Sequence, residues 1–171
     1  MELAPFRKTL LGRPPTRDQG VEQLEPVHEY RGGMSGFSEA EREAMRQRAE
    51  ELRREKGGNK KAKNLEAVQE LIDAMLPEDR DLAAAVHTMV TEEAPQLDAR
   101  TFYGMPAWEG SDGVVLFLQV SSKFDARYTT LGFQENAHLD DGAMWPTSYA
   151  IQELNDDTRA RIRELIRRAV H

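Results

Sequence analysis

TFYGMPAWEGSDGVVLFLQVSSKFDARYTTLGF, residues 101–133, is the segment that decides the fold. Aromatic and β-branched residues dominate three short runs in it, and glycine, serine and aspartate separate the later runs. Short turns between strand-like runs favour antiparallel neighbours, because a parallel connection needs a long crossover. We therefore expect an antiparallel meander with strands at 101–103, 114–120 and 127–133.

Helical patterns flank these strands on both sides. Upstream, apolar residues at helical spacing predict two packed helices, the first from about Asn64 and the second opened by Pro77. Downstream, a short strand at 148–151 precedes a closing helix that begins near Asp156. Helices that bracket a small sheet predict a two-layer α+β fold. The expected core stripes are Leu65, Val68, Ile72 and Met75, then Leu82, Val86, Met89 and Val90, and finally Ile162, Leu165, Ile166 and Val170.

The first third of the chain has a different composition. Residues 1–33 hold four of the eight prolines and no sustained apolar period, which predicts a disordered extension. Met34 then precedes a helix signature and is a candidate natural start. Ser38 and Glu41 form a capping-box pattern, which predicts a charged helix over 39–56 with a thin, mostly alanine stripe and loose docking. The expected organisation is an extension at 1–33, a helix stopped at Gly57-Gly58-Asn59 with a basic linker (60–63) within 34–63, and the α+β domain at 64–171.

Composition and charge narrow the function classes. The chain has no cysteine, which excludes thiolate catalysis and cysteine-based metal sites. Its longest apolar run, 114–118, is too short to span a membrane, so a cytosolic protein without membrane contacts is expected. Residues 1–63 carry 14 Lys and Arg against 11 Asp and Glu, whereas residues 64–171 carry 9 against 19. Such an acidic domain repels phosphates, so nucleic-acid binding is not expected.

Local signatures of catalysis are missing from the sequence. It contains no glycine-rich phosphate loop, no Gly-x-Ser-x-Gly elbow, no His-Glu-x-x-His pair and no dinucleotide fingerprint. We therefore expect a protein that is not an enzyme.

The segment Tyr103-Gly104-Met105-Pro106-Ala107-Trp108 is the most distinctive part of the chain. Its glycine and proline interrupt an aromatic strand, which predicts a bend at the sheet edge. A bend of this kind can leave aromatic side chains around a pocket for an anionic ligand, although the same residues are also typical of an ordinary helix–sheet core. The predicted pocket residues are Tyr103, Met105, Pro106, Trp108, Lys123, Arg127 and Tyr128.

Two groups of residues offer oxygen or nitrogen ligands for a metal. His138, Asp140 and Asp141 lie close together in a loop, a set that suits iron, manganese or zinc, and a solvated turn has the same composition. Glu66, Glu70 and Asp73 recur at helical spacing and can hold a hard cation weakly, or can simply form a solvated face.

Four short segments between Leu65 and Val170 resemble the YdhG-like family of bacterial domains, most of which have no known function. The segments are Leu76-Pro77-Glu78, Glu93-Ala94-Pro95, Tyr103-Gly104-Met105-Pro106-Ala107 and Trp145-Pro146-Thr147-Ser148-Tyr149. The resemblance implies a frataxin-like fold, with helices on one face of an antiparallel sheet. Because the family includes an iron chaperone, it also implies labile iron handling, although the matching segments contain no obvious iron ligand.

Two functional hypotheses follow. The first is a non-catalytic module that binds iron through its acidic surface and delivers it to an acceptor protein. The alternative is a small-molecule or peptide binding module that uses the bend at 103–108.

Overall fold

A computed structural model describes residues 36–54 and 60–171 of the chain. Residues 36–171 form one compact unit. The disordered extension expected at 1–33, the candidate start at Met34 and the helix stop expected at 57–59 lie outside the described residues.

The described residues form five helices and five strands, with most helices grouped before the strands and one after them, so the fold is α+β. The order is α1 (Glu39–Arg54), α2 (Lys60–Asp73), α3 (Pro77–Glu93), β1 (Asp98–Phe102), β2 (Met105–Gly110), β3 (Gly113–Gln119), α4 (Ser121–Phe124), β4 (Thr129–Phe133), β5 (Ser148–Ile151) and α5 (Asp156–Ala169). None of the described helices has the length and apolar character needed to cross a lipid bilayer.

The sheet is an open antiparallel meander in the order β1-β2-β3-β4-β5, as expected. The sequence prediction missed one strand, β2, because the segment at 103–108 was expected to bend. Tyr103 and Gly104 have φ angles of 53° and 69° and form a two-residue hairpin turn instead. Pro106 is tolerated inside β2 because the register of β2 with β3 starts one residue later, at Ala107↔Phe117.

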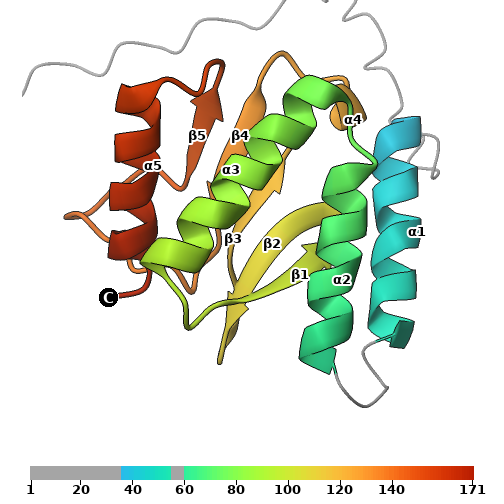
Figure 1. The fold of residues 1–171 in the computed structure, drawn as a ribbon, viewed down its shortest axis with the longest axis horizontal. Coiled ribbons are helices and arrows are strands. Elements are labelled where there is room, and N and C mark those ends of the chain that lie inside the picture. Colours follow the sequence, from blue (N-terminus) through green and yellow to red (C-terminus); the bar gives the residue numbers. More distant parts are fainter. Residues whose placement is uncertain (1–35, 55–59) are drawn as a thin grey trace, which may run out of the picture. The chain divides into compact units, whose positions relative to one another are not determined.

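Helices α2, α3 and α5 cover one face of the sheet (Figure 1). Their apolar faces and the inward side chains of the strands form one core, whose largest fully buried side chain is Trp108. The predicted stripes contribute Val68, Val86 and Ile166. Leu65 was expected in this core but is 39% exposed, so the buried stripe of α2 starts at Val68.

Helix α1 begins with the predicted capping box. The Ser38 hydroxyl accepts from the backbone N–H of Glu41 at 3.1 Å, and the Glu41 carboxylate accepts from the Ser38 N–H at 2.7 Å. Its apolar stripe is as thin as predicted, since Leu52 is 47% exposed. The neighbouring charged residue, Glu51, is buried although Leu52 is not. Polar contacts therefore hold this helix to the sheet.

The lysine-rich segment at 60–63 is the first turn of α2 and not the linker that was expected. The ammonium of Lys60 pairs with Glu109 at 3.4 Å, and that of Lys61 pairs with Asp98. Both carboxylates belong to the sheet, so the lysines attach the start of α2 to β1 and β2.

Candidate ligand site between α1, α2 and β1

The predicted aromatic pocket around 103–108 is mostly core. Trp108 is 1% exposed, and its indole N–H donates to Nδ1 of His87 on α3 at 3.3 Å. The two rings are stacked, with centroids 6.1 Å apart. Burial lowers the pKa of His87, which favours the neutral imidazole that can accept this bond. The neighbouring side chains of Met105 and Pro106 are also buried.

The remaining predicted pocket residues lie in two different places. Lys123 donates to the carbonyl oxygen of Gly104 at 2.6 Å and to Oε1 of Gln47 at 2.7 Å, so it lies beside the turn that carries Tyr103. Burial lowers the pKa of the Lys123 ammonium, while the nearby charges of Glu51 and Glu43 oppose that shift. Arg127 and Tyr128 instead line a separate hollow beside the start of α3. The predicted set is therefore not brought together.

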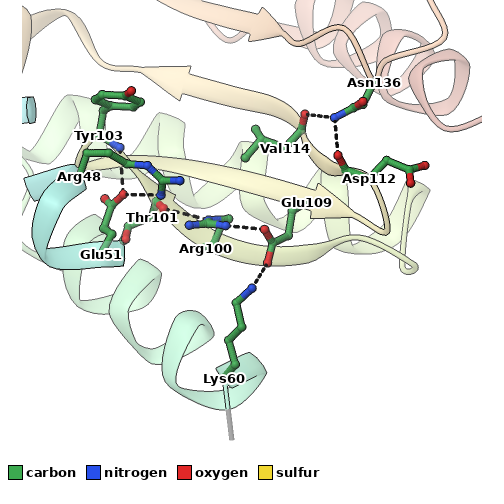
Figure 2. A network of polar contacts seen from close by, with 10 residues as sticks. All are labelled: Arg48, Glu51, Lys60, Arg100, Thr101, Tyr103, Glu109, Asp112, Val114 and Asn136. Carbon is green, nitrogen blue, oxygen red and sulfur yellow. Dashed lines mark hydrogen bonds and ion pairs between the residues drawn. The ribbon is translucent and has the colours of Figure 1, made fainter. Parts of the chain in front are cut away.

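The carboxylate of Glu51 organises the hairpin turn from the other side. It accepts from the backbone N–H of Gly104 at 3.0 Å. It also accepts from the backbone N–H of Tyr103 at 3.2 Å, as Figure 2 shows. The guanidinium of Arg48, one helical turn earlier, binds the same carboxylate at 3.1 Å. Hydrogen bonds to an ionised group are stronger than neutral ones, so the turn and α1 form one rigid corner.

A hollow with a volume of about 360 Å³ lies next to this corner, between α1, α2 and β1. Volumes of this order are typical of small-molecule sites. Its walls come from one face of each helix and its floor from the edge strand. The lining residues are Glu51 and Arg54 of α1, Lys60, Lys63, Asn64, Glu66, Ala67 and Glu70 of α2, and Arg100 and Thr101 of β1.

Arg100 places a buried cation in the lining of this hollow. Its side chain is 8% exposed and pairs with Glu109 at 2.5 Å, while its Nε donates to the Thr101 carbonyl at 3.2 Å. Figure 2 shows Arg100, Glu109 and Lys60 in one line of polar contacts beside the sheet. A planar guanidinium held in this way is pre-organised to bind carboxylates and phosphates.

The two lysines of α2 that line the hollow sit at an end of the helix where positive charge is unfavourable. The helix macrodipole is positive at its N-terminus, and the first turn of α2 contains no acidic residue. Lys60 is compensated by Glu109, whereas Lys63 forms no ion pair with any described residue. The described α2 residues that line this end of the hollow therefore include two cations, in a domain whose net charge is negative.

The predicted metal ligands do not form a cluster. Among residues 36–54 and 60–171, no three or more His, Asp or Glu side chains lie together so that they could hold a metal ion. His138, Asp140 and Asp141 are exposed on their loop, which is anchored by the buried Leu139. Of the acidic face of α2, Glu66 and Glu70 line the hollow beside lysines and arginines. Iron binding by either set stays a prediction.

Sequence reasoning missed most of this site. Glu66 and Glu70 were predicted as metal ligands, while Lys60 and Lys63 were assigned to a linker. One signal was present in the sequence: no glycine or proline interrupts the segment upstream of Leu65 until position 58, so the helical pattern of α2 can continue in that direction.

Comparisons with protein-family models, curated proteins and solved structures found no match to the chain.

Proposed function

We propose that the protein is a non-catalytic binding module whose small-molecule ligand occupies the hollow between α1, α2 and β1. The observation that carries the proposal is the buried Arg100 guanidinium at the floor of a hollow of ligand size. Burying a charge is costly unless hydrogen bonds hold it, and here Glu109 and the Thr101 carbonyl do so. The fold thus maintains a fixed cation in the lining of the hollow.

The lining also supports binding without catalysis. Among the described lining residues, Thr101 carries the only hydroxyl, and none is a histidine. Nucleophilic catalysis needs a nucleophile within hydrogen-bond reach of a base, and a general base works best with a pKa near the operating pH. The other lining groups are charged side chains, an amide and the Ala67 methyl, which suit recognition.

A variant that fills the hollow tests the proposal. Ala67 lines the hollow from the middle of α2, so Ala67→Phe should occupy it with a side chain. The matched control is Ala62→Phe, which places the same side chain on an exposed position of the same helix. Ligand-observed NMR with a panel of water-soluble carboxylates, phosphates and amines should find binders that Ala67→Phe loses and Ala62→Phe keeps. Binders unaffected by Ala67→Phe, or an empty panel, would reject the proposal.

The assignments implied by the YdhG-like resemblance also remain proposals. A frataxin-like fold is supported by the helices packed on one face of an antiparallel sheet. An iron-chaperone role is supported only by the exposed carboxylates of α2, and cations line the same hollow as two of them. A cytosolic location and an iron-acceptor partner rest on the sequence alone. We therefore rank small-molecule binding above iron delivery.

A further inference from the structure

The charges that line the hollow are sorted by sign along its length. On α2, the lining cations Lys60 and Lys63 come first, and the lining carboxylates Glu66 and Glu70 follow. Lys63 and Glu70 are seven residues apart, which corresponds to about 10 Å along a helix axis. The hollow therefore has a positive end and a negative end.

Helix α1 adds to the positive end. Arg54 is its last residue and lines the hollow, and Lys60 begins α2 just six positions later in the chain. Arg54 is only loosely paired, with its guanidinium 4.0 Å from the carboxylate of Glu50. Arg54 and Lys60 are thus close in sequence, at the C-terminal end of α1 and the N-terminal end of α2.

The negative end has carboxylates that form no ion pair with any described residue. Glu66 and Glu70 are exposed and form no ion pair with any described residue. Glu51 differs, since its carboxylate already accepts two backbone N–H groups and binds Arg48. Among the described lining residues, the carboxylates without an ion pair therefore both belong to α2.

We infer that the ligand of this hollow is a zwitterion, with its anionic group near Lys63 and its cationic group near Glu70. The inference rests on the proposed function and adds the ligand class to it. A purely anionic ligand would face Glu66 and Glu70, and a purely cationic one would face Lys63 and the loosely paired Arg54. A ligand with opposite charges at its two ends satisfies both, and such complementarity supplies specificity.

Three probes of the same chain length isolate this prediction: 6-aminohexanoate, hexanoate and hexylamine. The first carries both charges, and each of the others carries one. Calorimetry on the full chain at low ionic strength should give at least about threefold tighter binding of 6-aminohexanoate than of either relative, as expected for one additional exposed ion pair. Added salt should reduce that advantage, because the contacts are exposed.

Two charge variants assign the ends. Lys63→Gln should lower the affinity for 6-aminohexanoate to that for hexylamine, and Glu70→Gln should lower it to that for hexanoate. The matched controls are Arg168→Gln and Glu135→Gln, which make the same charge changes at exposed positions outside the hollow. Both controls should leave all three affinities unchanged.

The outcomes separate the inference from the proposed function. Equal binding of hexanoate and 6-aminohexanoate, abolished by Ala67→Phe, would overturn the zwitterion and leave the site in place. Binding of 6-aminohexanoate that survives Ala67→Phe would overturn both. If none of the three probes binds while other members of the panel bind and are lost in Ala67→Phe, the zwitterion is overturned and the site stays in place.

Discussion

The carboxylate of Glu51 in α1 accepts the backbone N–H of Gly104 at 3.0 Å, across 53 positions of sequence. This bond and its neighbour to the Tyr103 N–H join a helix with few buried apolar residues to a two-residue hairpin turn of the sheet. Because α1 contributes residues to the lining of the hollow, the bond also helps to position one wall of the proposed ligand site.

Replacing Glu51 should therefore loosen α1. Glu51→Gln removes the ionic partner of Arg48 and weakens both bonds to the turn, so the free energy of unfolding should fall by about 1–3 kcal/mol. Urea denaturation measures the loss, and hydrogen exchange should show faster exchange in α1. The control is Glu50→Gln, an exposed neighbour, for which no measurable change is expected. Equal stability of the two variants would contradict this role of Glu51.

A side chain at Gly104 should be destabilising, because it displaces the hydrogen-bonded ends of Gln47 and Lys123. Its φ is +69°, and an added Cβ would lie 1.6 Å from Oε1 of Gln47 and 2.3 Å from the ammonium of Lys123. The left-handed conformation alone costs about 1–2 kcal/mol for alanine. Gly142 has the same φ but no atom within 4 Å of such a Cβ, so Gly142→Ala measures that cost by itself. Thermal unfolding should show Gly104→Ala to be clearly less stable than Gly142→Ala, and similar melting temperatures would show that the contacts at the turn adapt.

His87 should make stability depend on pH. Burial lowers its pKa below the usual 6.5, so the unfolded chain binds the proton more readily than the native state does. The contribution of this group is complete above pH 6.5 and is lost as the pH falls from there through the lowered native pKa. His87→Gln should flatten this part of the profile, whereas His138→Gln, at an exposed position, should not. Denaturant midpoints between pH 7.5 and 5 measure the difference. Parallel profiles for both variants and the original chain would exclude His87 as the cause.

Iron binding through the acidic face of α2 has its own test. We expect anaerobic calorimetry with Fe(II) to show weak binding at most, because Glu66, Glu70 and Asp73 are exposed and belong to no group of three or more metal-binding side chains among the described residues. Replacing all three with alanine should remove that binding. If tight binding persists in the triple variant, iron is bound elsewhere in the chain.

The regular parts of the fold were predictable because they follow from periodicity. The helical stripe of α3 and the strand-like run that contains β4 were visible in the sequence, and the capping box of Ser38 and Glu41 located the start of α1. The β1–β2 hairpin was not predictable from the same signals. Its turn places Tyr103, a bulky residue, at positive φ, whereas sequence rules expect glycine, asparagine or aspartate there.

The candidate site was hidden for a different reason. It depends on where long charged side chains meet across elements, and charge runs in a sequence do not show their partners. Lys60 and Lys63 were interpreted as part of a solvated linker. In the structure α2 begins earlier, at Lys60, and β2 supplies Glu109 as the partner of Lys60. Arg100 was not singled out in the sequence, since its burial depends on α2 packing beside the edge strand.

The most direct test of the proposed site is an amide chemical-shift map of the ¹⁵N-labelled chain titrated with 6-aminohexanoate. The account predicts that the largest saturable shifts belong to the amides of Lys63, Ala67, Glu70 and Thr101, all of which line the hollow. Shifts centred on β5 and α5, or no saturable shift at all, would contradict it.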